Sequence, residues 1–316
     1  MKISLFYQTG LGGPSKFMGG LSNHLRKHKF KHNNTVKKII LNLFSKDCDV
    51  IHSTIGLPFN FWNRPYLLTI HGNFKKEKRT VGHFLFPLAV KSADVVTVPS
   101  HYLKNQLGLT NAIIIPNFVD TKEYTPRKHR SRKTINILTV TNFNFREKAR
   151  GVIKVVQILS NLKLKSIQVN LNILGEGKFL EEIQKEVDKF KSVNGNLKYF
   201  FYGYKDPSIF YRISDIFVYF SFLDNMPLVI MEAMASGLPV VSNDIGAVNE
   251  LIVNGDSGYV TSDDSLFLNY VYGLVKDYRL REKIGLKGRE RMVNFFDINS
   301  VLKLFDKLYR DVKNGK

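Results

Sequence analysis

The sequence predicts an α/β protein with two domains, each built on a parallel sheet whose strands are joined by helices. The chain has 316 residues, which is more than one hydrophobic core usually organises. Short apolar runs alternate with stretches of helical spacing, a pattern typical of parallel strands with crossover helices. The runs are nearly continuously apolar and rich in β-branched residues, as expected for strands that are buried on both faces.

Ten apolar runs are interpreted as strands. The first five are KISLFYQ (2–8), DVIHST (49–54), YLLTIHG (66–72), VVTVPS (95–100) and AIIIPN (112–117). The second five are INILTVTN (135–142), VNLNILG (169–175), LKYFFYG (197–203), IFVYFS (216–221) and PVVSND (239–244). This grouping predicts one sheet in each half of the chain.

A polar, basic segment without periodicity, DTKEYTPRKHRSRKT (120–134), separates the two sets and is typical of a linker. We place the boundary there, which gives an N-terminal domain of residues 1–131 and a C-terminal domain of residues 132–297. Residues 298–316 form an amphipathic pattern that predicts a helix able to pack back on the first domain. Its apolar face carries Val301, Leu302, Leu304, Phe305 and Leu308.

Several classes of protein are disfavoured by composition. No apolar run approaches the roughly 18 to 20 residues that span a bilayer. The N-terminal residues are interpreted as a first strand, not as a signal peptide, because they lack a long apolar region and a cleavage site. The single cysteine, Cys48, cannot form an intramolecular disulfide or a thiolate zinc site, which fits a reducing compartment. We therefore expect a cytoplasmic protein.

The net charge of +20 is unevenly distributed. Residues 1–130 carry 20 Lys and Arg against 6 Asp and Glu, so this half holds +14 of the total. Such a field favours anionic partners, which include nucleic acid, acidic lipid head groups and phosphorylated acceptors. A lysine-rich solvated surface without a partner is the alternative.

The most informative stretch is residues 221–260. Pro227 fits the first turn of a helix and Gly237 its C-terminal cap, so a helix of about ten residues is expected between them. The first backbone N–H groups of this helix, around Leu228 and Val229, lack intrahelical partners. They lie at the positive end of the helix dipole and therefore suit a pyrophosphate.

Two carboxylates flank this helix start. Asp224 precedes the helix and Glu232 lies about one and a half turns inside it. A carboxylate accepts paired hydrogen bonds from vicinal hydroxyls, so one of them could hold a sugar and the other a ribose. In the alternative interpretation Asp224 is a helix N-cap and Glu232 a solvated charge.

The run DNMPLVIMEAMASGLPVVSNDIGAVNELI (224–252) resembles the signature of family 4 retaining glycosyltransferases of the GT-B fold. That resemblance implies two Rossmann-like domains facing each other across a donor and acceptor cleft. Glu232 matches the second acid of the signature, and Asp224 stands where glutamate is commoner. The resemblance implies that Asp224 contacts donor-sugar hydroxyls, the amides of Leu228 and Val229 the diphosphate, and Glu232 the ribose.

A second match is VTNFNFREKARG (140–151), where the family has an arginine and then a lysine that neutralise the leaving diphosphate. Lys148 matches the lysine, but Asn142 occupies the arginine position. Asn142 can still donate a neutral hydrogen bond, and Arg146 or Arg150 is the expected substitute for the missing charge. Ordinary helix-surface charge is the alternative for both arginines.

Weaker matches extend the resemblance along the chain. Gly12 and Gly13 match a glycine pair that approaches donor and acceptor, and His71 matches a histidine that faces the sugar. Gly203 and Tyr204 would border the nucleobase. His71 as a core or capping histidine and Tyr204 as a core aromatic remain alternatives. The dinucleotide fingerprint G-x-G-x-x-G is absent from the glycine loop after the first strand, which disfavours nicotinamide chemistry.

The expected function is therefore retaining transfer of a sugar from a nucleoside-diphosphate sugar, such as a UDP- or GDP-sugar, to a glycan or lipid-linked acceptor. No cofactor and no metal is expected. A role in polysaccharide or glycolipid biosynthesis follows from this acceptor class. The alternatives are a basic nucleic-acid-binding protein, for which no reading motif is found, and a GT-B relative without transferase activity.

Two further features concern surfaces. His24, His28 and His32 recur every four residues and could share a helix face, and we expect a basic surface there, not a metal site. The basic run 75–79 and the aromatic loop 58–66 could rest on anionic lipid, which would make the protein peripheral on the cytoplasmic face of a membrane. Core packing of the loop aromatics is the alternative.

Overall fold

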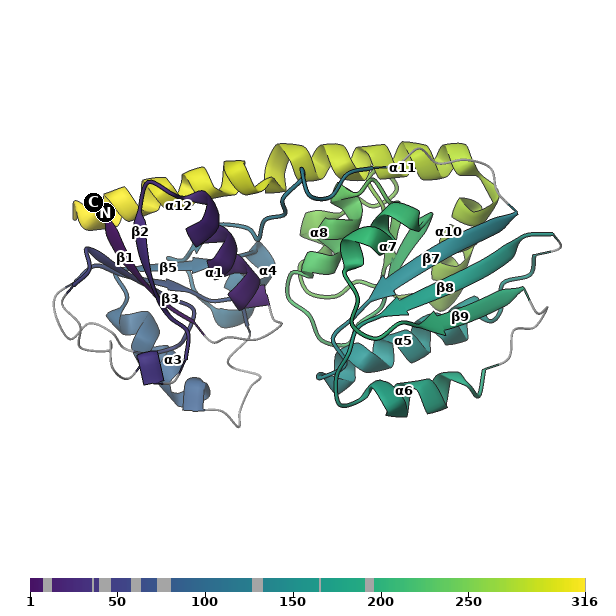
Figure 1. The fold of residues 1–316 in the computed structure, drawn as a ribbon, viewed down its shortest axis with the longest axis horizontal. Helices are drawn as coiled ribbons and strands as arrows, with labels where there is room; N and C mark the ends of the chain where they lie inside the picture. Colours follow the sequence, from purple (N-terminus) through teal and green to yellow (C-terminus); the bar gives the residue numbers. More distant parts are fainter. Residues whose placement is uncertain are drawn as a thin grey trace. The chain divides into compact units, whose positions relative to one another are not determined.

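The computed structural model describes residues 1–7, 13–35, 37–39, 47–57, 64–72, 81–126, 133–164, 166–190 and 196–315. The chain divides into two compact units, which we call unit 1 (Met1–Phe118 with Ile298–Lys316) and unit 2 (Val119–Asp297). Two α/β units are thus present, as predicted (Figure 1).

The boundary between the units lies at Phe118, earlier than the predicted position between residues 131 and 132. The segment after Phe118 is held by unit 2. The Thr121 hydroxyl donates to Asp297 at 2.6 Å, and the Arg289 guanidinium donates to the Tyr124 carbonyl at 2.6 Å. These are tertiary contacts that local sequence polarity does not reveal. Residues 127–132 of the predicted linker lie outside the described residues.

Unit 1 is a six-stranded parallel sheet in the order β2-β1-β3-β4-β5-β6. Its described elements are β1 (Lys2–Phe6), α1 (Gly13–His24), β2 (Lys29–Asn33), β3 (Val50–Ser53), β4 (Tyr66–Thr69), α3 (Val81–Ser92), β5 (Val95–Val98), α4 (His101–Leu107), β6 (Ile113–Ile114) and α12 (Ile298–Lys313). All five strands predicted for this half are present. The edge strand β2 was missed, because its sequence KFKHN has no apolar run.

Apolar side chains cover both faces of this sheet. On one face, Ile3 and Leu5 of β1 pack with α1 and with Val301 and Phe305 of α12. On the other face, Phe6, Ile51 and Leu68 pack with α4. Helix α12 therefore completes the core of unit 1, although all of unit 2 separates it from β6 in the chain. The predicted apolar face of α12 is buried except for Leu304, which is exposed.

Unit 2 is also a six-stranded parallel sheet, in the order β12-β11-β10-β7-β8-β9. Its described elements are β7 (Thr134–Val140), α5 (Arg146–Leu159), β8 (Gln168–Leu174), α6 (Leu180–Val187), β9 (Leu197–Phe201), α7 (Pro207–Ile213), β10 (Ile216–Tyr219), α8 (Leu228–Ala235), β11 (Val240–Ser242), α9 (Val248–Leu251), β12 (Tyr259–Val260), α10 (Asp264–Lys276), α11 (Tyr278–Arg291) and the π-helix η2 (Met292–Phe296). All five predicted strands are present, and the two-residue β12 was missed.

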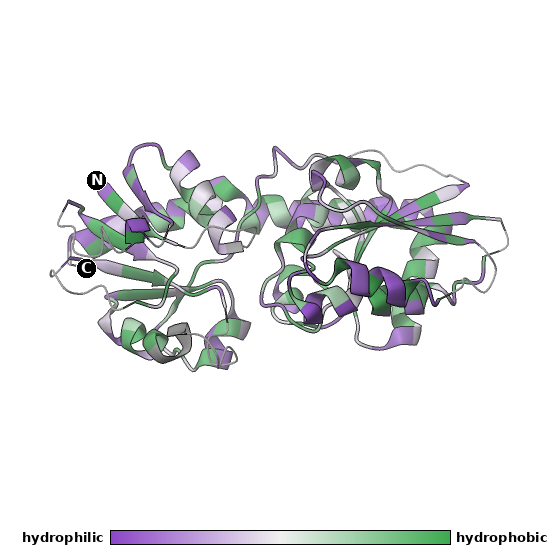
Figure 2. Ribbon diagram, turned by 60° about the horizontal axis from the view of Figure 1, so that its bottom comes forward, coloured by the Kyte–Doolittle hydropathy of each residue, from purple (hydrophilic) through white to green (hydrophobic). Residues whose placement is uncertain are grey.

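The apolar strands of both sheets carry the hydrophobic colour of Figure 2, and the core of unit 2 lies where β7, β8 and β10 meet α5 and α10. Gly151 allows α5 to approach the sheet closely, because a Cβ at this position would lie closer than 3.0 Å to the carbonyl of Phe220. This approach sets the position of the loop that follows β10. Within the described part of the chain, no helix is both long and apolar enough to span a bilayer.

Candidate functional site

The strand order of unit 2 reverses next to β7. From β7 the chain adds β8 and β9 on one side, and it then returns to add β10, β11 and β12 on the other side. In open parallel sheets, ligands bind outside the carboxyl ends of the strands at such a switch point. Here the loops that follow β7 and β10 meet, and they carry the residues singled out from the sequence.

An ion pair joins the start of α5, which follows the first of these loops, to the loop after β10. The Lys148 ammonium, in the first turn of α5, lies 2.7 Å from Oδ2 of Asp224 in the loop after β10. The Tyr219 hydroxyl donates to the same carboxylate oxygen at 2.6 Å. The Asp224 side chain is 11% exposed and the Lys148 side chain 25%, so the pair is accessible from one side. Asp224 is therefore not the N-cap of α8, which is Pro227.

The loop that carries Asp224 is held by backbone contacts. The Asn243 side chain accepts from the N–H of Ser221 at 3.0 Å and donates to its carbonyl at 2.8 Å. Gly246, with a φ of 61°, sits where a Cβ would lie closer than 3.0 Å to the carbonyls of Asp224 and Asn225. The loop after β11 therefore supports the loop after β10 at close range, which fixes the Asp224 backbone.

Helix α8 begins beside this pair. Its N-cap is Pro227, and among the described residues no side chain accepts a hydrogen bond from the amides of its first turn. The first backbone hydrogen bond of the helix runs from the N–H of Ile230 to the carbonyl of Pro227. The N–H groups of Leu228 and Val229 therefore point out of the helix end. Both residues are half-buried. The predicted helix is thus present, with an uncapped end that suits an anion.

Glu232 lies on the buried side of α8 and is 5% exposed. The Tyr211 hydroxyl donates to its Oε2 at 3.0 Å. Burial, together with the Glu232 charge, raises the pKa of Tyr211 well above its usual value of 10, and the pKa of Tyr124 is raised for the same two reasons. The interpretation of Glu232 as a solvated charge is wrong, because the carboxylate is buried against these phenols.

The residues expected to supply further phosphate contacts lie around β7 and α5. Asn142 is half-buried, and its Oδ1 accepts from the N–H of Asn144 at 2.9 Å. Arg146 is exposed and donates to Glu182 of α6 at 2.7 and 3.2 Å. The Arg150 guanidinium lies 5.8 Å from the centroid of the Phe222 ring. Neither arginine contacts Asp224 or Lys148. Among the described residues, Lys148 is therefore the cation that lies beside Asp224.

The two glycine loops after β8 and β9 lie at the same edge of the sheet. The N–H of Gly175 donates to the carbonyl of Gly203 at 2.9 Å, and Gly175 at φ 133° packs against the carbonyl of Thr141. Tyr204 is 61% exposed, so the interpretation of Tyr204 as a core aromatic is wrong. The Thr141 hydroxyl is buried and has no hydrogen-bond partner among the described residues, at the carboxyl end of β7.

In unit 1, His71 follows β4 and is half-buried. Its ring meets that of Phe17 edge to face, with centroids 4.6 Å apart. Burial lowers the pKa of His71 from 6.5 to about 4, against an opposing hydrogen bond to Asn117, so the ring is neutral near pH 7. Gly13 begins α1, whereas Gly12, the basic run 75–79 and loop residues 58–63 lie outside the described residues.

The expectation that His24, His28 and His32 share a helix face is wrong. His24 ends α1, His28 lies in the following turn, and His32 is on β2. His28 pairs with the buried Asp306 of α12 at 2.8 Å, and His32 shares a hydrogen bond of 2.9 Å with the Tyr7 hydroxyl. Among the described residues, no group of His, Cys, Asp and Glu could hold a metal ion.

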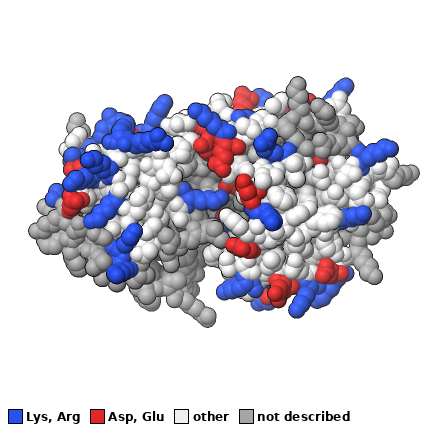
Figure 3. Space-filling view, viewed as in Figure 1, with Lys and Arg blue, Asp and Glu red and all other residues white. Residues whose placement is uncertain are grey.

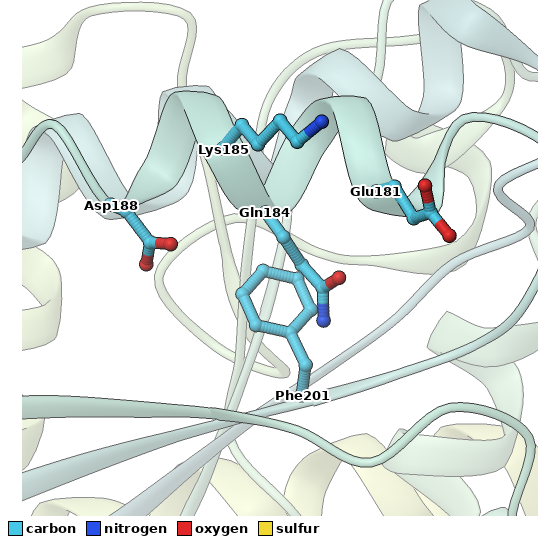
Figure 4. Close-up of a pocket in the computed structure, with 5 residues that line it drawn as sticks. All are labelled: Glu181, Gln184, Lys185, Asp188 and Phe201. Atoms are coloured by element: carbon cyan, nitrogen blue, oxygen red, sulfur yellow. The ribbon is translucent and has the colours of Figure 1, made fainter.

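Two surface features complete the description. On the face seen in Figure 3, Lys and Arg side chains gather over α12, where Lys303, Lys307, Arg310 and Lys313 are exposed. A pocket in unit 2 lies between α6 and the end of β9 (Figure 4). It is lined by Glu181, Gln184, Lys185, Asp188 and Phe201. None of these is a predicted site residue, and the pocket is not at the switch point.

Sequence reasoning missed the residues that hold the two carboxylates. Tyr219 and Tyr211 donate to Asp224 and Glu232, while Gly151 and Gly246 permit the close backbone packing around the site. Only Tyr219 left a signal that could have been used, because a tyrosine ends the strand directly before the acidic loop. The partners of Glu232 come from other elements and follow only from the fold.

Two family models match the chain. The model described as "Glycosyl transferases group 1" matches residues 120–291, and the model described as "Glycosyltransferase Family 4" matches residues 10–123. The first match contains the whole switch point of unit 2, and the second contains most of unit 1.

Two curated relatives agree with these family matches. The chain is 27% identical over 253 residues to N-acetyl-alpha-D-glucosaminyl L-malate synthase of Bacillus anthracis, covering 73% of this chain and 64% of the relative. It is 24% identical over 222 residues to UDP-Gal:alpha-D-GlcNAc-diphosphoundecaprenol alpha-1,3-galactosyltransferase of Escherichia coli, covering 64% of this chain and 55% of the relative. The chain thus spans less than two thirds of the length of either relative.

The fold is shared with solved structures. HepE of Anabaena, solved in complex with UDP and glucose, matches with a TM-score of 0.79 at 16% identity, covering 98% of this chain and 100% of that one. This likeness, with the two parallel sheets, confirms the predicted GT-B fold class.

Proposed function

Because this chain belongs to the glycosyl transferases group 1 family, we propose that it transfers a sugar from a nucleoside-diphosphate sugar to an acceptor. One observation carries the proposal. The Lys148–Asp224 pair lies at the switch point of unit 2, where the uncapped helix α8 begins. A cation and free amides suit a diphosphate, and a carboxylate suits the hydroxyls of a sugar.

We assign the donor contacts as follows. Lys148 and the N–H groups of Leu228 and Val229 bind the diphosphate, and Asp224 accepts from hydroxyls of the donor sugar. Glu232 binds the ribose from the floor of the site, held by Tyr211 on one oxygen. The buried Thr141 hydroxyl is a further donor at this edge. Gly203 and the exposed Tyr204 border the base, with the Tyr204 ring free to stack on it.

The charge of the leaving diphosphate is then balanced mainly by Lys148. Asn142 contributes a neutral hydrogen bond, because its Oδ1 is used within its own turn and its amide group remains a donor. Arg146 supplies a second cation only after it leaves Glu182. The site therefore relies more on helix amides and less on side-chain charge than a site with arginine at position 142.

The proposed reaction retains the anomeric configuration. The acceptor attacks from the face that the diphosphate leaves, and a leaving phosphate oxygen accepts the acceptor proton. The residues assigned above supply fixed hydrogen-bond donors, which stabilise charge where it develops. We assign His71 to the sugar on the resemblance alone, where a neutral imidazole would contribute hydrogen bonding and no charge. Gly12 and Gly13 are assigned to the backbone approach to donor and acceptor. We propose that the reaction uses no metal and no cofactor.

For the acceptor we propose a glycan or a lipid-linked saccharide. The name of the E. coli relative gives a lipid-linked sugar as its acceptor and a UDP-sugar as its donor, and HepE was solved with UDP. Basic side chains along α12 favour an anionic membrane surface. We therefore propose cytoplasmic, peripheral action in polysaccharide or glycolipid biosynthesis, with a UDP-sugar or GDP-sugar as donor.

The test begins with thermal stabilisation by UDP-, GDP-, ADP- and CMP-sugars, with the Glu232→Ala variant in parallel. We expect a saturable rise in melting temperature with one nucleotide, which the variant loses. The selected donor is then incubated with candidate acceptors, and the anomeric configuration of the product is read by NMR. Binding without transfer to any acceptor would favour a relative without transferase activity. Binding of nucleic acid in place of nucleotide sugars would contradict the proposal.

A further inference from the structure

Tyr219 occupies an unusual position relative to the ion pair. It is the last residue of β10, 2% exposed, and its hydroxyl donates to Asp224 Oδ2 at 2.6 Å. Lys148 contacts the same oxygen at 2.7 Å. The other oxygen, Oδ1, accepts from the N–H of Asn225 at 2.9 Å. The two side chains that contact the carboxylate, Tyr219 and Lys148, therefore share one of its oxygens.

These two partners differ in how firmly they are held. Lys148 has a flexible side chain that is 25% exposed, and a diphosphate attracts an ammonium more strongly than a single carboxylate does. Tyr219 is fixed in a buried strand and carries no charge. A bound diphosphate can draw Lys148 away from Asp224, but it cannot move Tyr219.

We propose that Tyr219 is a positioning residue that keeps the Asp224 carboxylate aimed at the donor sugar after the diphosphate has drawn Lys148 away. The inference rests on the proposed function and adds a residue to it. Without a donor, Lys148 and Asp224 neutralise each other. With a donor, Lys148 serves the phosphates, and the phenol keeps Asp224 oriented toward the sugar hydroxyls.

Two observations support this role. Burial, together with the Asp224 charge, raises the pKa of Tyr219 well above 10, so the phenol stays a donor across the working range of pH. The second acid of the site has the same arrangement, since Tyr211 donates to Glu232 from a buried position. Each carboxylate is thus held by a neutral donor that a ligand cannot displace by charge.

The test uses Tyr219→Phe with the nucleotide sugar selected by the thermal panel and with its nucleoside diphosphate alone. We expect the affinity for the nucleoside diphosphate to change less than about twofold, because Lys148 and the α8 amides are intact. The kcat/KM for the nucleotide sugar should fall about tenfold, as expected for the loss of one hydrogen bond to a charged group. Equal losses for both ligands would overturn the inference.

A double-variant cycle separates positioning from a general structural role. If Tyr219 acts through Asp224, Tyr219→Phe changes kcat/KM less than about twofold once Asp224→Ala is present, because alanine leaves the phenol no side-chain acceptor. Additive losses would overturn the inference. Tyr309→Phe is the matched control, because Tyr309 is a buried tyrosine of unit 1 whose hydroxyl shares a hydrogen bond with His52 at 2.6 Å. It should lower the melting temperature about as much and leave kcat/KM unchanged.

The failure of this inference is distinct from the failure of the proposed function. If wild-type protein binds the nucleotide sugar and transfers the sugar while Tyr219→Phe behaves like wild type, the inference alone is wrong. If wild-type protein binds no nucleotide sugar, both fall together.

Discussion

The two units use one architecture in opposite ways. In unit 2, a charged and partly accessible pair, Lys148 and Asp224, lies beyond the carboxyl ends of β7 and β10. In unit 1, the buried polar groups of β3 and β4 are neutral. His52 is fully buried and shares hydrogen bonds with the hydroxyls of Tyr309 and Thr69. A parallel sheet can thus present charge to a ligand at one switch point, or use neutral hydrogen bonds to fasten a helix to its core.

The largest expected effect is on the rate of sugar transfer, and it comes from the charged pair of unit 2. Lys148→Ala should lower the rate of sugar transfer about 100-fold, because it removes the cation placed at the leaving group. The measurement is kcat/KM with the donor selected above. Lys154→Ala is the matched control, since Lys154 lies on the same helix and pairs with Asp264 at 2.5 Å. A comparable loss in the control would show that the effect comes from α5 and not from the site.

The next largest effect concerns the close packing of α5 against the loop after β10. Gly151→Ala should destabilise unit 2 by about 1–3 kcal/mol, because the added Cβ would overlap the Phe220 carbonyl. Thermal and urea unfolding measure the loss. Gly273→Ala, in α10, is the opposite control, because its Cβ would meet Leu280 at 3.8 Å in ordinary contact. There we expect a gain of about 0.5–1 kcal/mol, and a loss at Gly273 would contradict the packing argument.

The buried, neutral His52 of unit 1 predicts that the stability of the protein depends on pH. Burial lowers the pKa of His52 from 6.5 to about 3, so the unfolded chain binds a proton between these values and the folded chain does not. Stability is therefore complete above about pH 6.5 and falls as the pH drops toward 3, by about 1 kcal/mol per pH unit. His52→Gln should lower the slope of the melting-temperature profile between pH 4.5 and 7, and His71, whose pKa is also lowered, accounts for the slope that remains. His101→Gln, which removes an exposed histidine, is the control.

The smallest effect is expected at the exposed Arg146–Glu182 pair. Arg146→Gln should leave the melting temperature almost unchanged, because exposed ion pairs contribute little to stability. The same variant tests the phosphate role expected for Arg146. A loss of donor affinity greater than tenfold would show that Arg146 leaves Glu182 for the donor, and an unchanged affinity would leave Lys148 as the main cation.

The sequence predicted the fold class, ten of the strands and the helix that starts between Asp224 and Glu232. These features depend on local patterns, namely apolar runs and the positions of Pro227 and Gly237. The elements it missed have no such pattern. Strand β2 is polar along its length, and β12 has two residues. The histidines near α1 were misread because a four-residue spacing persists through a turn into a strand.

The site was only partly predictable for a different reason. Motif positions name Asp224, Glu232 and Lys148, but they do not show which groups hold them. Tyr211 reaches Glu232 from α7, and Arg289 of α11 fixes the segment after Phe118 to unit 2. These contacts join elements far apart in the chain. They arise only when the sheet order is known, which explains why the predicted boundary lay too late.

Helix α12 also sets the order in which the chain can fold during synthesis. Unit 2 is continuous in sequence, so all of its residues are available once Asp297 has left the ribosome. Unit 1 has to wait for Ile298–Lys313, because Val301, Phe305 and Tyr309 of this helix complete its core. Tyr309 also supplies a hydrogen-bond partner of His52. We therefore expect the first part of the chain to be made to finish folding last, with the apolar surfaces of β1 and α1 uncovered until α12 has been made.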